Sequence, residues 1–182
     1  MTPLHESLAA LCDLAKRRSS IKTLTVASDV FGRVAIEAMQ SACAELRKIH
    51  DKQLQEHPKL ELSYSRGLGR LPRVFWIGAV PSGRTVGNSI SATICFAKDG
   101  SGMVAGIMTS SLFPSRLHCV QRTALPSFLD VNGTKWETKY NDRFLIPKDF
   151  LMSDFSEELF VAHFQHCITQ LRRQLRTGIR GA

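Results

Sequence analysis

The segment from Lys59 to Thr109 constrains the fold more than any other part of the chain. In it, apolar residues either alternate with polar ones or form short runs, and loops of glycine, proline and serine separate these runs. The connector 97–102, which contains Asp-Gly-Ser-Gly, is typical of a hairpin turn. Such a pattern predicts neighbouring antiparallel strands. The expected strands span 60–64, 74–80, 90–96 and 103–109.

Two helices are expected before this segment. Thr2 and Pro3 suit an N-cap and a first helical position, and a basic cluster at 16–18 suits a helix end. Ser28 is expected to cap a longer helix that ends near Glu56, before a proline. The expected buried stripe of that second helix is Phe31, Val34, Ala38, Ala42, Leu46 and Ile49.

The chain ends in another predicted helix. Ser156 is its expected N-cap, and Glu157 and Glu158 follow in the first turn. Its expected apolar face consists of Phe160, Phe164, Cys167, Leu171 and Leu175. Residues 135–140 and 144–146 are predicted to add short strands. We therefore expect one α+β domain over residues 1–182, in which N-terminal helices and a C-terminal helix bracket a mostly antiparallel, strongly curved sheet.

Charge and cysteine usage narrow the class of protein. The net charge of +8 and the isoelectric point of about 9.6 favour polyanionic partners such as nucleic acid. Five scattered cysteines without a Cys-x-x-Cys pair indicate a reducing compartment, so we expect a cytoplasmic protein. The sequence shows neither a basic signal-peptide start nor an apolar run of ~20 residues, so no membrane association is expected.

Two loops combine arginine with glycine. Glycine lets a backbone approach a phosphate closely, and the guanidinium group binds two phosphate oxygens at once. The alternative is an ordinary solvated turn. Neither loop contains the Gly-Lys-Ser/Thr of a Walker A motif, so nucleotide hydrolysis and a cofactor are not expected. The candidate DNA-backbone residues are Arg66, Gly67, Gly69, Arg70, Arg73 and Arg84.

Trp76 lies between these two loops. On an extended strand Phe75 and Trp76 point to opposite faces, so one is expected in the core and the other facing a groove. Burial is the commoner fate of tryptophan. Its place between basic loops favours a second role, because aromatic side chains hold unpaired bases by stacking.

Three other interpretations remain open. Asp130, Glu137 and Lys139 resemble the acid and acid-x-lysine order of Mg²⁺-dependent nucleases, although a charged surface strand explains them equally well. The protein could instead be an interaction adaptor with a basic face. His163, His166 and Cys167 suggest a zinc site, because His163 and Cys167 are one helical turn apart, but a third ligand would have to come from His118 or Cys119. Packing explains Cys167 more simply, so we expect no metal.

Several of these motifs together resemble a known family. They are Leu62-Ser63-Tyr64, the first glycine loop, Phe75–Val80, Gly87–Ile90, the hairpin, Ala105–Ile107 and Thr138–Asn141. This combination is similar to the N-terminal DNA-binding domain of McrB-type restriction enzymes, which depend on modified cytosine.

The resemblance implies a module that binds double-stranded DNA, extrudes a modified cytosine and holds it in an aromatic pocket. It implies pocket roles for Trp76 and Tyr140, and Ser91 and Cys95 stand where the family has a tyrosine and a leucine. A serine cannot stack on a base, so either the pocket is rebuilt or the recognised modification differs. The implied protein is a non-enzymatic specificity domain of a phage-defence restriction system. Cleavage and GTP hydrolysis would belong to a motor or nuclease in another domain or subunit.

Overall fold

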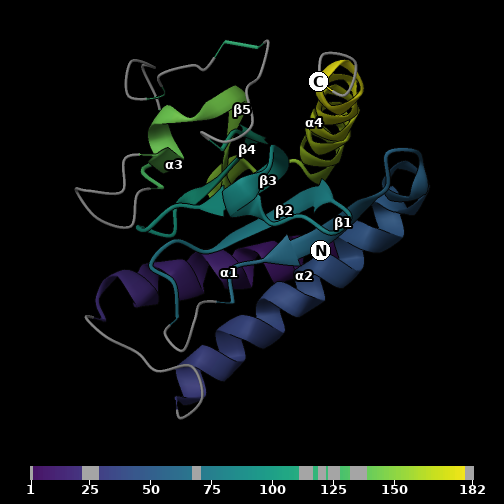
Figure 1. The fold of residues 1–182 in the computed structure, drawn as a ribbon. Helices are drawn as coiled ribbons and strands as arrows, with labels where there is room; N and C mark the ends of the chain where they lie inside the picture. Colours follow the sequence, from purple (N-terminus) through teal and green to yellow (C-terminus); the bar gives the residue numbers. More distant parts are fainter. Residues whose placement is uncertain are drawn as a thin grey trace.

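The computed structural model describes residues 2–21, 29–66, 71–110, 117–118, 122, 128–131 and 139–178. Figure 1 shows the arrangement of their helices and strands. The helices are α1 (Pro3–Ser19), α2 (Val30–Gln55), α3 (Lys139–Asp142) and α4 (Glu157–Gly178), with 3₁₀ turns η1 (Val86–Asn88) and η3 (Met152–Asp154). The strands are β1 (Leu60–Tyr64), β2 (Trp76–Pro81), β3 (Ser91–Phe96), β4 (Gly102–Met108) and β5 (Phe144–Leu151).

The strands form one antiparallel sheet in the order β1-β2-β3-β4-β5, so each strand pairs with its neighbours in sequence. The expected α+β class, with helices at both ends of an antiparallel sheet, is confirmed. The sheet is open and not strongly curled, so the expected strong curvature fits only loosely. No helix in the described part of the chain is long and apolar enough to cross a membrane.

One face of the sheet carries the main core. Ile77, Ile94 and Ile107 point to this face from three adjacent strands and are fully buried. The helices α1, α2 and α4 cover it, as the α1 and α2 layer below the sheet in Figure 1 illustrates. Cys12, Cys43 and Cys167 lie in this core, as expected. Burial raises the pKa of each of the three thiols to about 12, so they stay protonated at neutral pH.

The opposite face carries a smaller apolar cluster. Alternate residues of the same strands point to it, because side chains along a strand alternate between the two faces of a sheet. Its buried members are Val74, Cys95, Ala97, Val104, Met108, Leu129, Val131 and Phe144. Trp76 and Tyr140 pack against this cluster and are partly buried. The predicted opposition of Phe75 and Trp76 is confirmed, since Phe75 belongs to the main core.

The predicted helix caps are correct at Thr2 and Ser156, which accept hydrogen bonds from the backbone of His5 and Leu159 at 3.3 Å. The start of α2 differs from the prediction. Asp29 is its N-cap and accepts from the Phe31 backbone at 2.8 Å, and Ser28 lies outside the described residues.

The predicted buried stripe of α2 is partly wrong. Val34 and Ile49 are 44% and 40% exposed, while Ala35 and Met39, one position further along, are fully buried. The helix has apolar residues on both candidate faces, so periodicity alone does not decide which face the sheet covers. Only Ala42 and Leu46 of the predicted stripe are fully buried.

The region after residue 131 also departs from the prediction. The C-terminal residues of the expected strand 135–140 form the helical turn α3, and residues 132–138 lie outside the described part. The next strand runs from Phe144 to Leu151, well beyond the expected 144–146. It passes Pro147 through a register shift opposite Gly106, where Ile146 has a positive φ of 46°. β5 is an edge strand of the sheet and is bulged at this point, and both features tolerate a proline.

Candidate functional site

A pocket of about 260 Å³ opens on the face of the sheet opposite the long helices. The start of β2, the β2–β3 loop, the end of β4 and the α3 region contribute to it. Its lining residues are Trp76, Val86, Gly87, Met108, Thr109, Ser110, Tyr140 and Arg143. The pocket therefore has two aromatic side chains, a thioether, two hydroxyls and a guanidinium group. It also unites Trp76 and Tyr140, which are 64 positions apart in sequence.

Ser65 holds the backbone of Trp76 on both sides. The Ser65 backbone N–H donates to the carbonyl of Trp76 at 3.0 Å, and the Trp76 N–H donates to Oγ of Ser65 at 3.1 Å. Ser65 itself is buried. These bonds extend the pairing of β1 and β2 past Tyr64 and fix the position from which the indole reaches the pocket. Ser65 could not be predicted for this role, because a serine after a strand carries no local signal for it.

Gly78 lets the β2–β3 loop lie close to the sheet near Trp76. A Cβ atom at this position would lie 3.2 Å from Oγ1 of Thr93 and 3.3 Å from Cγ2 of Val86. Val86 therefore approaches the sheet directly above Gly78. The β2–β3 loop can fold back over the sheet because this position has no side chain, and the loop brings Val86 and Gly87 to the pocket.

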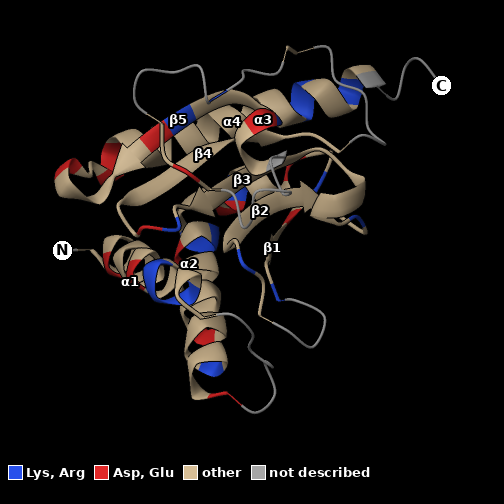
Figure 2. Cartoon of the chain, turned by 90° about the vertical axis from the view of Figure 1, so that its left-hand side faces the viewer, with Lys and Arg blue, Asp and Glu red and all other residues tan. Residues whose placement is uncertain are grey.

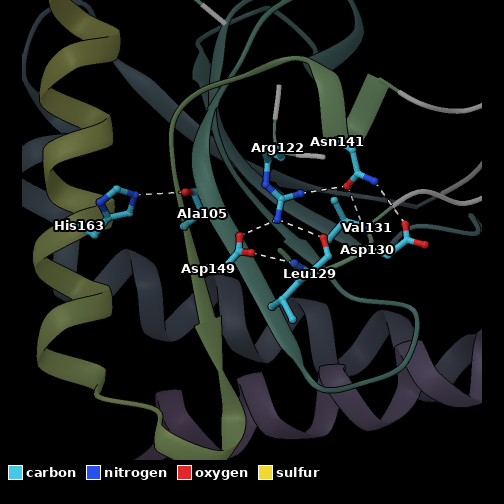
Figure 3. A network of polar contacts seen from close by, with 8 residues as sticks. All are labelled: Ala105, Arg122, Leu129, Asp130, Val131, Asn141, Asp149 and His163. Atoms are coloured by element: carbon cyan, nitrogen blue, oxygen red, sulfur yellow. Dashed lines mark hydrogen bonds and ion pairs between the residues drawn. The ribbon is translucent and has the colours of Figure 1, made fainter. Parts of the chain in front are cut away.

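Tyr140 is held through its neighbour Asn141, which belongs to a polar network shown in Figure 3. Oδ1 of Asn141 accepts from Nη1 of Arg122 at 3.0 Å and from the Val131 backbone at 3.3 Å. Its Nδ2 donates to Oδ1 of Asp130 at 3.4 Å. The α3 turn is only four residues long, so such bonds, rather than its own helical pattern, fix it in place.

Arg122 is the centre of that network and is fully buried. Its Nη2 forms an ion pair with Oδ1 of Asp149 at 2.5 Å and donates to the Leu129 carbonyl at 3.0 Å. Its guanidinium carbon lies 5.6 Å from the centroid of the Phe144 ring. A buried cation needs such compensation, because removing it from water is costly. The burial of Arg122 could not be predicted from the sequence, since an arginine in an irregular segment is typical of a surface residue.

Ser91 and Cys95 lie one layer deeper than a pocket wall. Both are fully buried, and neither lines the pocket. Oγ of Ser91 shares a hydrogen bond of 2.8 Å with Thr93, and Sγ of Cys95 lies 4.0 Å from Sδ of Met108. Met108, which is paired with Ser91 across the strands, forms the pocket surface in their place. We therefore correct the expectation that Ser91 and Cys95 are walls: they underlie the pocket.

The described arginines of the two basic loops lie close to pocket residues in sequence, but two of them lie towards the helices, since the charge of Arg66 acts on Cys43 of α2 and that of Arg73 on Arg18 of α1. Arg66 follows the Ser65 clamp and stacks on the Tyr64 ring at 4.8 Å. Arg73 precedes the buried Val74, and Arg84 stands two residues before Val86. All three are exposed. Gly67, Gly69 and Arg70 lie outside the described residues.

The basic residues are not concentrated on the long helices. Figure 2 shows basic and acidic positions interspersed along α1 and α2, and α4 begins acidic and ends basic. Some basic residues serve the interior instead. The buried Arg18 donates to the carbonyls of Leu71 and Pro72 at 3.0 and 3.2 Å and so anchors the chain just before Arg73.

The structure bears on the nuclease interpretation only at Asp130. Its carboxylate forms an ion pair with Lys98 and accepts from Asn141, so it links the hairpin to α3. Glu137 and the side chain of Lys139 lie outside the described part. No cluster of three or more potential metal ligands occurs among the described histidines, cysteines and acids.

His163 and Cys167, the first two candidates for zinc, serve the helix–sheet contact. Nε2 of His163 donates to the Ala105 carbonyl at 3.1 Å (Figure 3), and Cys167 is fully buried. Burial lowers the pKa of His163, so the ring is held neutral in this contact. Of the two residues that could supply a third ligand, Cys119 lies outside the described residues, and the described His118 forms no cluster of potential metal ligands with this pair.

Comparisons with known proteins leave the family of the chain to be inferred from its site: no protein-family model matches the sequence, and no curated protein does.

Proposed function

We propose that this protein is a cytoplasmic, non-enzymatic module that recognises modified DNA for a restriction or defence system. It would extrude a modified base, most simply a cytosine derivative, into the pocket between Trp76 and Tyr140. A motor or nuclease in another domain or subunit would carry out cleavage. The observation that carries this proposal is the meeting of these two aromatic side chains in one open pocket.

The energetics of extrusion fit such a pocket. Flipping a base out of the duplex costs a few kcal/mol of stacking and pairing. Stacking on an aromatic side chain contributes about 1–3 kcal/mol per base. An indole and a phenol on either side of a base can therefore offset much of the cost. Trp76 and Tyr140 stand on different structural elements, as two walls of a slot require.

The exposed arginines would supply the phosphate contacts that duplex DNA needs. Arg84 lies in the loop that reaches the pocket, whereas Arg66 and Arg73 precede the strand that carries Trp76 and lie towards the helices. Phosphate contacts from such residues fix the position of a duplex without reading its sequence. The arginines would hold the backbone while the pocket tests the base.

The test compares Trp76→Ala, Tyr140→Ala and Arg84→Ala on duplexes that differ only in one modified base. The panel contains cytosine, methylcytosine, hydroxymethylcytosine, glucosylated hydroxymethylcytosine and methyladenine. We expect the aromatic changes to remove discrimination between modified and unmodified DNA. We expect Arg84→Ala to weaken all duplexes alike, because a phosphate contact carries no base information.

Two variants serve as controls. Arg33→Ala removes an exposed arginine on α2, away from the pocket, and should change binding little. Phe128→Ala removes a 37% exposed aromatic side chain that does not line the pocket. Discrimination that survives both aromatic pocket changes would refute base extrusion. Failure to bind any DNA at low salt would instead favour an adaptor that meets an acidic protein. DNA cleavage with Mg²⁺ that Glu137→Ala abolishes would favour the nuclease.

A further inference from the structure

The guanidinium group of Arg143 is a hydrogen-bond donor at the pocket, and the proposed function names no acceptor for it. Arg143 lines the pocket and is exposed. Among the described residues, its guanidinium group has neither an ion-pair partner nor a hydrogen-bond partner. Its backbone is nevertheless anchored, since its carbonyl accepts from the Thr109 N–H at 3.4 Å. A fixed backbone with an unpaired guanidinium at a pocket is poised to bind a ligand acceptor.

The rest of the described lining offers no negative charge. Besides the guanidinium, its side chains are aromatic, aliphatic, thioether or hydroxyl groups, and none is a carboxylate. A carboxylate is the group that accepts from the exocyclic amine of cytosine. Arginine is a donor only, and it pairs best with two adjacent acceptors such as O6 and N7 of guanine.

We infer that the pocket selects a cytosine whose C5 substituent carries a carboxylate. The guanidinium of Arg143 can bind a carboxylate through two charge-assisted hydrogen bonds, and the described lining contains no acid that would compete for it. Every extruded base presents neutral acceptors, such as O2 and N3 of cytosine or O6 and N7 of guanine, so only the negative charge distinguishes this ligand. A cytosine with only a methyl group at C5 carries no such charge. This inference rests on the proposed function and adds to it the chemical class of the extruded base.

A phosphate contact is the competing use of the same guanidinium. In that case Arg143 would hold the backbone of the extruded nucleotide whatever its base. The two uses make different predictions, because a contact to the base acts on one member of a duplex panel and a phosphate contact acts on all. Lysine at position 143 separates them further: it keeps the charge and loses the two-pronged geometry.

The experiment measures the dissociation constants of the wild type, Arg143→Gln and Arg143→Lys. Each is tested on duplexes with one mismatched, easily extruded position, which carries methylcytosine, carboxylcytosine, hydroxymethylcytosine or guanine. We expect wild type to bind the carboxylcytosine duplex roughly tenfold more tightly than the methylcytosine and guanine duplexes. Arg143→Gln should lose this preference, and Arg143→Lys, which keeps the charge without the two-pronged geometry, should keep only part of it and retain the salt dependence of wild type. Guanine presents two neutral acceptors, so binding of the guanine duplex as tight as that of the carboxylcytosine duplex would overturn the requirement for negative charge.

Arg33→Gln is the matched control for loss of one exposed positive charge. Arg143 is exposed, so its variants are expected to unfold at the wild-type urea concentration, and this is measured alongside. Equal or tighter binding of methylcytosine by wild type would overturn the inference. So would an equal loss of affinity on every duplex in Arg143→Gln, which would assign Arg143 to phosphate. In both cases discrimination between modified and unmodified DNA can still depend on Trp76, and the proposed function then still holds. Absence of any discrimination that depends on Trp76 would refute the proposed function itself.

Discussion

The guanidinium of the buried Arg122 donates from Nη1 to Oδ1 of Asn141 at 3.0 Å, one residue after the pocket tyrosine. The same guanidinium is paired with Asp149 on β5. One cation thus ties the short α3 turn to the last strand of the sheet. Through this tie, the position of Tyr140 depends on a residue that lies outside the pocket.

Removal of Arg122 should therefore affect both stability and the pocket. Arg122→Ala leaves the Asp149 carboxylate, whose side chain is 18% exposed, without its ion-pair partner. Loss of one partner of a buried pair costs about 3–5 kcal/mol, and partial exposure of Asp149 favours the lower value. Urea unfolding followed by circular dichroism measures the change. The control is Lys98→Ala, which breaks an ion pair that is 51% and 39% exposed; it should cost less than about 1 kcal/mol. Similar losses in the two variants would contradict the structural role of Arg122.

Asn141→Ala is expected to separate positioning from stability. It removes the acceptor of Arg122 and the acceptor of the Val131 N–H but keeps the Arg122–Asp149 pair. We expect about 1–3 kcal/mol of destabilisation. Discrimination between modified and unmodified DNA should fall as well, although Asn141 does not line the pocket. Unchanged discrimination in a folded Asn141→Ala protein would show that Tyr140 keeps its place without this bond.

His50 should make stability depend on pH. It is 1% exposed at the kink of α2, and neither ring nitrogen has a hydrogen-bond partner. Burial lowers the pKa of His50 from 6.5 to about 4. Between these values the unfolded chain binds a proton that the folded protein excludes, so stability is present above pH 6.5 and is lost as the pH falls towards 4.

The expected loss from His50 between pH 7 and pH 5 is about 2 kcal/mol, from the difference between its folded and unfolded pKa values. Urea titrations at both pH values measure it. His50→Leu should lack this component, and substitution of the exposed His166 by alanine should retain it. If His50→Leu shows the full wild-type loss, other groups cause the pH dependence.

Gly106→Ala should disturb the β4–β5 bulge next to Phe144, a buried member of the smaller apolar cluster. A Cβ atom there would lie 2.7 Å from Cδ1 of Phe144, 3.1 Å from the Leu145 carbonyl oxygen and 3.1 Å from Cα of Pro147. Two of these neighbours are backbone atoms that cannot move aside cheaply, so we expect a loss of about 1–3 kcal/mol. Gly87→Ala, where a Cβ would meet only Oγ1 of Thr85 at 3.9 Å, is the comparison and should be nearly neutral for stability.

DNA affinity should fall steeply with salt concentration, because each neutralised phosphate releases bound counterions. Substitution of Arg66, Arg73 or Arg84 by alanine should reduce the slope of log K against log salt by about 1 if that residue contacts one phosphate. Arg33→Ala should leave the slope unchanged. Fluorescence anisotropy across a range of salt concentrations provides the measurement, and identical slopes for all four variants would refute the phosphate contacts.

The sequence alone determined the parts of the protein that depend on local pattern. Alternation and turn chemistry predicted the four strands from β1 to β4 to within two residues at each end. Capping residues predicted the starts of α1 and α4, and strand alternation put Phe75 and Trp76 on opposite faces. These features repeat within a few residues, so a single chain contains the information that specifies them.

Only the tertiary structure decided the features that depend on distant partners. The buried face of α2 follows from the sheet that covers it, since apolar residues on both faces left periodicity undecided. Arg122 could be buried because Asp149, Asn141 and the Leu129 carbonyl converge on it from other segments. The pocket forms in the same way: Trp76, Tyr140 and Arg143 gain a common surface through strand pairing and a buried ion pair. Contacts between residues that lie far apart in the chain leave no periodic signal, which is why the sequence pointed to Trp76 but not to Arg143.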